Sequence, residues 1–235
     1  MQVFKFKQVD STQILAKKYL ENNQKIAAFI TESQTSGYGK QGRNFYSPKT
    51  GIYFSVAYPK FVPNREKISL LTLRIATEVV ECLQVFFPDK EFKLKWVNDI
   101  YLDGKKVAGV LTELSKDGLV VGVGINVQTR FFPEEIRKKA GGITSDHFDK
   151  EKLTNELLKS VEIGVKQYSD DSFLKKYRQL SNVIGKNVVL EIGKRKITGL
   201  VDGIDNLGRL VIMSDGKETA YSSGEISKVN VDWTK

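Results

Sequence analysis

The stretch FKLKWVNDIYLDGKKVAGVLTELSKDGLVVGVGINV, residues 92–127, decides the fold. It contains three apolar, strand-like segments joined by the dipeptides Asp103-Gly104 and Asp117-Gly118. An Asp-Gly pair between apolar segments is a strong signal for a two-residue hairpin turn. The sequence therefore predicts an antiparallel meander of three strands from Phe92 to Val127.

Two-residue turns also fix which residues of the meander lie opposite each other. With such turns, Gly109 of the middle strand would face both Asn98 and Asn126. The alternation of strand side chains places Gly122 and Gly124 on the same face. A floor almost without side chains suits a flat ligand, and asparagine amides can donate and accept at the edge of a purine. We expect a binding site on this face.

Two lysines of the meander do not fit this arrangement directly. The same pairing puts Lys95 and Lys106 on the face opposite the asparagines. A β-bulge near Trp96-Val97-Asn98, or the length of the lysine side chains, would bring all four residues into one pocket. An exposed lysine is more often solvated than functional, so the sequence leaves these alternatives open.

Upstream lies a glycine-rich basic loop, Gly37-Tyr38-Gly39-Lys40-Gln41-Gly42-Arg43, called the glycine loop below. Its three glycines match the spacing of a dinucleotide-binding fingerprint, which requires a helix immediately afterwards. Residues 44–51 instead form a turn-rich passage into a strand. The backbone N–H groups and the charges of Lys40 and Arg43 favour an anionic ligand. The alternative is a flexible loop with solvated charges.

The rest of the chain supplies the frame around these segments. Strands are predicted at residues 3–9, 25–33 and 51–58, and helices at residues 10–20, 66–87, 150–168 and 172–180. At Asn182 the composition changes to β-branched residues and glycine turns, which predicts a main domain of residues 1–181 and a small one of residues 182–235. Residues 183–231 suit an SH3-like β-barrel, either a packing appendage or a contact for substrate.

Composition narrows the class of protein. The 235 residues are 40% hydrophobic and 28% charged, which is ordinary for a globular protein. Cys82 is the only cysteine, so an internal disulfide and a thiolate metal site are excluded. No apolar segment resembles a signal peptide or a membrane span, and we expect a cytoplasmic protein. The net charge of +9 fits nucleic acid, an acidic protein partner or simple solubility.

Several segments occur together in the order and spacing of biotin–protein ligases. They are Asp10-Ser11-Thr12-Gln13, Gln34, the glycine loop, Lys95-Trp96-Val97-Asn98-Asp99, Lys106-Val107-Ala108-Gly109 and Gly122-Val123-Gly124-Ile125-Asn126. The sequence resembles the short class of that family, without an N-terminal DNA-binding domain, over essentially the whole chain. The resemblance implies an α+β catalytic domain with a mixed, largely antiparallel sheet, like that of class II aminoacyl-tRNA synthetases, and a C-terminal SH3-like β-barrel.

The resemblance also implies an activity. ATP and biotin would react, with Mg²⁺ held mainly through the ATP phosphates, to give biotinyl-5'-AMP, and the biotinyl group would pass to a lysine of a biotin carboxyl carrier protein domain. An acidic carrier would account for the positive net charge, because opposite charges speed encounter. DNA and membranes are not expected as partners, and a homodimer is expected.

Site residues follow from the matching segments. Biotin would be bound by Ser11, Thr12, Gln13, Gln34, Tyr38, Gly39, Lys40, Lys106, Gly109 and Gly122. ATP would be bound by Gly37, Lys40, Arg43, Lys95, Trp96, Asn98 and Asn126. Lys106 and Lys40 would be the catalytic residues, and the glycine loop would be a lid over the adenylate.

The sequence departs from the common family pattern at three positions. Tyr38 and Lys40 stand where arginines are frequent, and Val97 stands where proline is usual. Lysine keeps the positive charge but lacks the bidentate fork of arginine. Lys40 would therefore retain the reactive adenylate less firmly than arginine does in relatives.

Two other functions compete with this interpretation. A lipoate or octanoate ligase shares the catalytic fold, but the polar groups of Ser11, Thr12, Gln13 and Gln34 would be unpaired against an acyl chain, which is costly. An RNA-binding module would need exposed aromatic residues for base stacking, and the barrel region offers only Tyr221 and Trp233.

Overall fold

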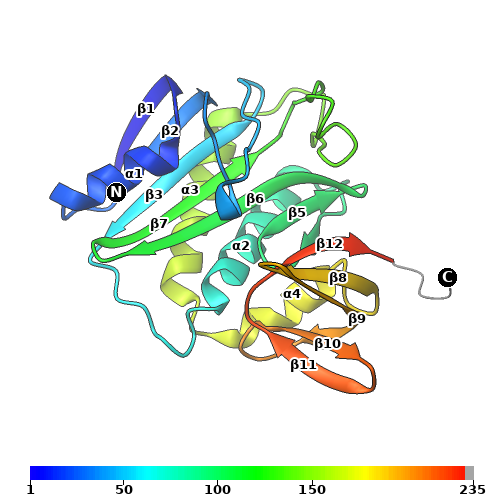
Figure 1. The fold of residues 1–235 in the computed structure, drawn as a ribbon. Helices are drawn as coiled ribbons and strands as arrows, with labels where there is room; N and C mark the ends of the chain where they lie inside the picture. The colour runs from blue at the N-terminus through cyan, green and yellow to red at the C-terminus, as the bar shows by residue number, and fades with distance from the viewer. Residues whose placement is uncertain (231–235) are drawn as a thin grey trace.

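The computed structural model describes residues 1–230 and has a large mixed sheet with helices on both faces and a smaller antiparallel sheet (Figure 1). The first half contains β1 (Gln2–Val9), α1 (Thr12–Asn22), β2 (Ala27–Gln34), the 3-10 turn η1 (Lys40–Gly42), β3 (Ile52–Pro59), α2 (Leu70–Phe86), β4 (Lys93–Lys95), β5 (Asp99–Leu102), β6 (Lys105–Ser115) and β7 (Gly118–Ile125). The second half contains α3 (Lys150–Gln167), η2 (Asp171–Phe173), α4 (Leu174–Leu180), β8 (Asn187–Ile192), β9 (Arg195–Ile204), β10 (Leu210–Ser214), β11 (Lys217–Tyr221) and β12 (Glu225–Val229). The α+β fold class predicted from the sequence is confirmed.

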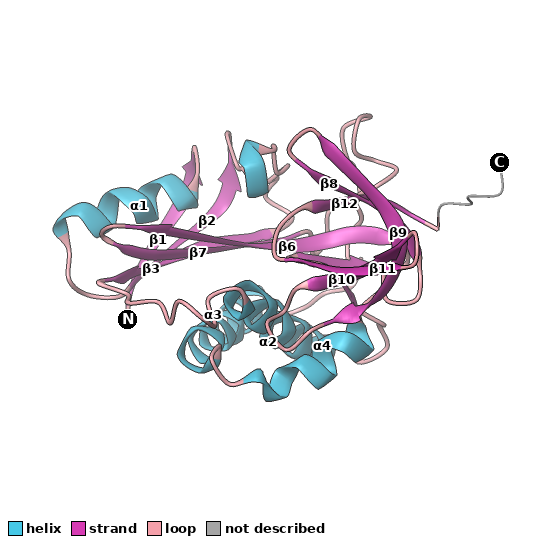
Figure 2. Ribbon diagram, turned by 60° about the horizontal axis from the view of Figure 1, so that its bottom comes forward, coloured by secondary structure: helices cyan, strands magenta, loops and turns pink. Residues whose placement is uncertain are grey.

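The large sheet has the strand order β1-β2-β3-β7-β6-β5-β4. Only β1 and β2 run parallel, because α1 connects them as a crossover, and the other neighbours are antiparallel. Figure 2 shows α1 above one face of the sheet and α2, α3 and α4 below the other. No helix in residues 1–230 is long and apolar enough to cross a membrane.

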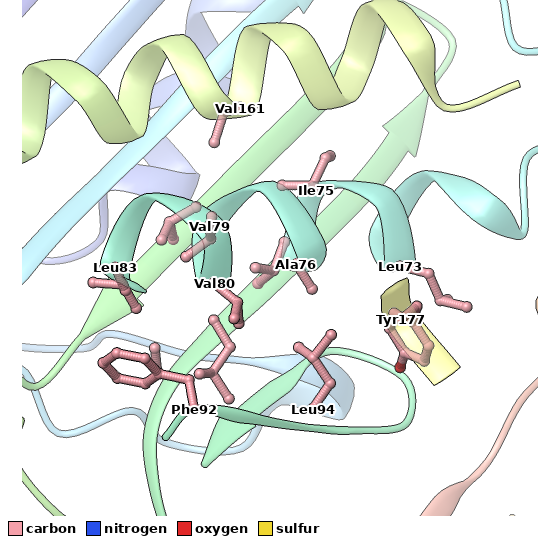
Figure 3. Packing of buried hydrophobic residues seen from close by; sticks show 14 of the residues in the cluster. Leu73, Ile75, Ala76, Val79, Val80, Leu83, Phe92, Leu94, Val161 and Tyr177 are labelled. Atoms are coloured by element: carbon pink, nitrogen blue, oxygen red, sulfur yellow. The ribbon is translucent and has the colours of Figure 1, made fainter. Parts of the chain in front are cut away.

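Packing of α2 holds the lower face of the sheet in place. Its inward side chains include Leu73, Ile75, Val79 and Leu83, all fully buried. They pack against Val161 of α3 and against residues of the sheet edge such as Leu94 (Figure 3). Each such side chain contributes about 1.5–3 kcal/mol by leaving water. The opposite face, which carries α1, is therefore supported by a rigid core.

The predicted meander forms, but the prediction of its first strand is wrong. Residues 92–102 do not form one strand: Lys95 pairs with Asp99, so β4 and β5 make a hairpin around residues 96–98. This turn is held by contacts distant in sequence. The amide Nδ2 of Asn98 donates to the Val110 carbonyl at 2.9 Å, and the Val110 N–H donates to the Asn98 carbonyl at 3.0 Å. The meander therefore has four strands, not three.

The two Asp-Gly turns differ from each other. The turn at Asp103-Gly104 is confirmed, with φ of 50° and 75°, and Leu102 pairs with Lys105. The second turn is centred one residue earlier than predicted, because Ser115 pairs with Gly118. Gly118 has φ of 146° and lies against the backbone of the neighbouring strand β3, so it begins β7 and does not complete the turn.

This shift changes the predicted pairing without exchanging the faces of β7. Because of this shift, Gly109 lies opposite Gly124, not Asn126. A separate irregularity in the β5–β6 pair places Gly109 opposite Asp99, not Asn98. A slip of two residues in the β6–β7 pair keeps the same side chains on the same face. The glycine face was therefore predicted correctly, whereas its row of asparagines was not.

The smaller sheet has the strand order β11-β10-β9-β8-β12, and the part of the chain that forms it is called the small β-domain below. It has turns at Gly193, Gly208 and Asp215-Gly216, each with positive φ. Contacts tie it to the main domain: the Trp96 indole N–H donates to the Gly208 carbonyl at 3.0 Å, and the Ser69 hydroxyl donates to the Leu207 carbonyl at 2.6 Å. Val231 and Trp233, named in the sequence analysis, lie outside the described residues.

Candidate active site

A cavity of about 400 Å³ lies between the upper face of the large sheet, the glycine loop and β12. Most of the residues predicted to form a site line it: Ser11, Thr12, Gln13, Gln34, Tyr38, Gly39, Lys40, Arg43, Lys95, Asn98, Lys106, Gly109, Gly122 and Asn126. Segments far apart in the sequence therefore meet at one site, as the spacing of the motifs indicated.

Two predicted ATP-binding residues do not line the cavity. Trp96 is 3% exposed, and its indole N–H is used by the Gly208 carbonyl of the small β-domain. Gly37, the first residue of the glycine loop, is tightly packed, because an added Cβ would meet Gln34, Ser47 and the Phe45 carbonyl. Both residues have evident packing roles, so their contribution to ATP binding stays a prediction.

One end of the cavity is a polar wall formed by Thr12, Gln13, Gln34 and Ser55. Thr12 begins α1, and its backbone N–H donates to Gln34 Oε1 at 2.9 Å. The Thr12 and Ser55 hydroxyls are 2.8 Å apart, and Ser55 Oγ donates to Gln13 Oε1 at 2.9 Å. Thr12, Gln13 and Ser55 are all buried. Buried polar groups are costly unless paired, and here they pair with one another.

Ser11 stands beside the polar wall as the N-cap residue of α1. Its side chain makes no capping hydrogen bond to the helix, although this is the usual role of serine at that position. It is 2% exposed and lines the cavity. The Ser11 hydroxyl therefore makes no hydrogen bond to the helix end, and the residue lines the cavity.

The glycine floor is present but is covered by side chains. The Cβ position of Gly122 is occupied by Gln13 Oε1, that of Gly124 by the ring of Phe45, and the space beside Gly109 by the tip of Lys106. The glycines therefore give room to these side chains on the upper face of the sheet. Phe45, which follows the glycine loop, was not identified from the sequence.

The other end of the cavity is basic and contains Lys40, Arg43, Lys95 and Lys106. Lys106 reaches this face because of a β-bulge at Val107: Ile100 pairs with Ala108, whereas Tyr101 pairs with Lys106. A bulge near residues 96–98 was one of two explanations that the sequence left open, and these residues form a turn instead. The extra residue resolves the conflict between Lys106 and the glycine face.

Charges at this basic end are close together. Lys106 Nζ lies 2.6 Å from Asp99 Oδ1, and Asp99 also lines the cavity. Burial lowers the pKa of Lys95, reinforced by the positive charges of Lys106 and Arg43 and opposed by Asp99. Burial and the charge of Arg43 likewise lower the pKa of Lys40. Such a concentration of buried positive charge favours an anionic ligand.

The glycine loop lies over the cavity and is held at both sides. Lys40 Nζ donates to the Gly224 carbonyl at 3.1 Å, and Arg43 forms an ion pair with Glu225 at the start of β12. On the other side the Tyr38 hydroxyl donates to Glu113 Oε2 at 3.0 Å. Glu225, Ile226 and Ser227 line the cavity, so the small β-domain contributes to the site directly.

The basic end offers few oxygen ligands for a metal ion. Residues 1–230 hold no group of three or more His, Cys, Asp and Glu side chains that could bind a metal. Asn126 Oδ1 is buried without a hydrogen-bond partner, and Asp99 is paired with Lys106. Mg²⁺ needs six oxygens and commonly takes several from substrate phosphates. The residues fit an ion held mainly through phosphates.

Ser55, Asp99 and Glu113 belong to the site or its support but were not singled out from the sequence. Ser55 lies opposite Gly122 in the β3–β7 pair, and Glu113 lies on the same face of β6 as Gly109. Ser55 is a polar residue in an otherwise apolar strand, and Glu113 follows the largely apolar middle of β6, which is a signal for a site only when the strand pairing is known. Asp99 follows Asn98 directly in the sequence and was quoted only as part of its motif.

Taken together, the fold and the cavity define a protein that binds two kinds of group side by side: a polar head group at the wall and an anionic group at the basic end. The model of the biotin/lipoate A/B protein ligase family matches residues 5–129, and the model of the biotin protein ligase C-terminal domain matches residues 183–229. The chain belongs to the biotin/lipoate A/B protein ligase family.

Solved structures and curated relatives place it within that family. A biotin protein ligase from Aquifex aeolicus in complex with biotin and ATP is 34% identical, covers 96% of this chain and 97% of its own, and has a TM-score of 0.83. The bifunctional ligase/repressor BirA of Escherichia coli is 32% identical over 85% of this chain and 65% of its own length. The biotin–[acetyl-CoA-carboxylase] ligase of Mycobacterium tuberculosis is 29% identical over 84% of this chain and 77% of its own. The chain thus matches less than two thirds of the length of the bifunctional E. coli relative.

Proposed function

We propose that this protein activates biotin with ATP and transfers it to a lysine of a biotin carboxyl carrier protein domain. One observation carries the proposal: a single cavity joins a wall of paired amides and hydroxyls to a cluster of partly buried cations, two on the glycine loop and two on the sheet below it. The wall suits a ureido ring, and the cations suit a carboxylate and phosphates. Relatives whose names include biotin and ATP support the assignment.

In the first step, a carboxylate oxygen of biotin attacks the α-phosphorus of ATP. The bond from that phosphorus to the bridging oxygen of the β-phosphate breaks, which gives biotinyl-5'-AMP and pyrophosphate. Negative charge builds up on the α-phosphate, and a positioned cation stabilises it strongly in a site shielded from water. We assign this role to Lys106, whose tip is fixed by Asp99.

Lys95, Lys40 and Arg43 hold the remaining phosphate charge. Lys95 and Lys40 are largely buried, so their charges are little screened by solvent. When bound through the phosphates, Mg²⁺ would neutralise part of their charge, with Asn126 Oδ1 as a free oxygen at the cavity. Asn98 and Asn126 would meet the nucleotide, as the family resemblance implies.

In the second step, the neutral amine of a carrier lysine attacks the acyl carbon of the adenylate. The acyl–phosphate bond breaks, AMP leaves and an amide forms. The glycine loop would exclude water from the reactive acyl group until the carrier arrives. An acidic carrier matches the net charge of +9. A homodimer stays a prediction from the family resemblance, and a cytoplasmic setting stays a prediction from the composition and the N-terminal sequence.

The proposal is tested by incubating the protein with Mg-ATP, an apo carrier domain and either biotin or lipoate, and by measuring the mass of the carrier. We expect the mass of one biotinyl group on the carrier lysine and none from lipoate. Omission of ATP serves as the control and should abolish the transfer. Modification by lipoate without modification by biotin would contradict the proposal.

A further inference from the structure

Glu113 lies beside the polar wall, and its carboxylate accepts three hydrogen bonds from two segments. Gln13 Nε2 of α1 donates to it at 2.8 Å, Lys17 Nζ of α1 at 2.6 Å, and the Tyr38 hydroxyl of the glycine loop at 3.0 Å. The Glu113 side chain is 28% exposed. It joins the helix that begins at the wall to the loop that covers the cavity.

An ionised carboxylate only accepts hydrogen bonds, and this fixes the orientation of Gln13. The Gln13 amide must turn Nε2 toward Glu113, so Oε1 faces Ser55 and fills the space above Gly122. Without Glu113 the two ends of the amide could exchange places. The carboxylate therefore determines which end of Gln13 meets the wall.

The orientation of Gln13 also determines how the hydroxyl groups of the polar wall direct their protons. Ser55 has one hydroxyl proton and donates it to Gln13 Oε1 at 2.9 Å. Thr12 also has one proton, with Ser55 Oγ at 2.8 Å and Gln34 Oε1 at 3.2 Å as its acceptors. Both protons are thus used inside the wall. What the hydroxyls of Thr12 and Ser55 offer to a ligand is oxygen lone pairs.

A wall of acceptors recognises a ligand that carries N–H donors. An aliphatic acyl chain gives no such donor and would leave these oxygens unpaired, which is costly in a buried site. Burial raises the pKa of Tyr38, opposed by its hydrogen bond with Lys17 and reinforced by Glu113. The Tyr38 hydroxyl therefore stays protonated at neutral pH and keeps its bond from the glycine loop to Glu113.

We propose that Glu113 is a positioning residue that sets the hydrogen-bond polarity of the polar wall and so makes the site specific for an acid with ring N–H groups. Its partner Tyr38 attaches the glycine loop to the same carboxylate but does not set the polarity. The proposal deepens the proposed function and rests on it for the identity of that acid as biotin.

Isothermal titration calorimetry of the full chain with biotin and with octanoate tests this. Glu113→Ala should weaken biotin binding about tenfold or more, by loss of well-oriented hydrogen bonds to the ring, and should leave octanoate affinity unchanged. Glu113→Gln can still accept the bond from Gln13 through its own amide oxygen, so it should regain most of the biotin affinity. An equal loss for both ligands, or no loss for either, would overturn the proposal.

Two further variants distinguish the effect of Glu113 on the polar wall from the effect of its other hydrogen bonds and from the general effect of losing a glutamate. Lys17→Met removes only the bond from Lys17 to Glu113, and Lys17 does not line the cavity, so the ratio of biotin to octanoate affinity should stay at the parental value; a drop as large as that of Glu113→Ala would refute the assigned role. Glu156→Ala is the matched control, because this glutamate pairs only with Lys159 on the surface of α3. If the parent protein binds octanoate but not biotin, both the proposed function and this inference are wrong. If the parent protein prefers biotin and Glu113→Ala keeps the parental ratio of biotin to octanoate affinity, only this inference is wrong.

Discussion

Asp99 Oδ1 lies 2.6 Å from Lys106 Nζ, and this ion pair fixes the tip of the lysine beside Gly109 at the floor of the cavity. Both side chains are mostly shielded, with 30% of Lys106 and 21% of Asp99 exposed. A carboxylate at this distance holds the Lys106 ammonium group at the cavity before a substrate arrives. The arrangement depends on the bulge at Val107, without which Lys106 would point to the opposite face of the sheet.

Replacement of Lys106 by methionine tests whether this cation acts on the transferred phosphate. We expect kcat for biotin-dependent exchange of pyrophosphate into ATP to fall by about 10²–10³-fold, the typical effect of removing one group that stabilises transition-state charge. The control is Lys105→Met, because Lys105 is exposed and does not line the cavity. A parental exchange rate in Lys106→Met would remove this residue from the reaction.

The ion pair between Arg43 and Glu225 should act on ligand binding more than on stability. Its side chains are 48% and 33% exposed, and such pairs contribute only about 0–1 kcal/mol to folding. We expect Arg43→Glu and Glu225→Arg each to raise KM for ATP, because each leaves two like charges between the glycine loop and β12. The exchanged pair in one protein should restore part of the KM. A double variant no better than the single ones would show that the pairing itself is unimportant.

A substitution of Trp96 tests whether this residue serves the packing of the protein or contacts ATP as predicted. Trp96→Phe keeps an aromatic ring but leaves the Gly208 carbonyl without its indole donor. The loss of this buried hydrogen bond should lower the free energy of unfolding by about 1–3 kcal/mol, measured in urea, with KM for ATP unchanged. A raised KM with unaltered stability would instead support the ATP-binding role.

Features that depend on local sequence could be predicted, and those that depend on distant contacts could not. The turn at Asp103-Gly104 and the start of α1 near Ser11 follow from neighbouring residues alone, and both are found. The hairpin around residues 96–98 has no glycine signal. It is held by the contacts of Trp96 with Gly208 and of Asn98 with Val110, which lie 112 and 12 residues away.

The same distinction applies to the site. Its lysines and glycines stand in recognisable segments, and the cavity does bring together Lys95, Lys106 and Gly122. The supporting residues Ser55 and Glu113 carry no local signal, because their meaning arises only when β3, β6 and β7 are placed side by side. A shift of one residue in the second turn was enough to misplace Asn126 in the predicted row.

The lowered pKa of Lys95 should be visible in the pH dependence of the first step. Burial, together with Lys106 and Arg43, lowers the pKa of Lys95 below the ordinary value of 10.5. As the pH rises, the free protein therefore loses this charge earlier than an ordinary lysine would, and kcat/KM for ATP should fall on the alkaline side below pH 10.5. Lys95→Arg, which keeps its charge, should move that fall to higher pH. An identical alkaline limb in the two proteins would contradict a role for this charge.

Lys40 provides the test of the glycine loop as a lid. Its Nζ donates to the Gly224 carbonyl at 3.1 Å, so Lys40 attaches the loop to the small β-domain beside the ion pair of Arg43 with Glu225. Lys40→Gly removes the bond and the charge, and it should release more free biotinyl-5'-AMP into solution than the parent protein. Lys40→Arg should release less than the parent, because a bidentate fork holds carbonyl and phosphate oxygens more firmly. Free adenylate is measured by mass spectrometry of the filtrate after a single turnover without carrier. Equal release from all three proteins would show that Lys40 does not control the lid.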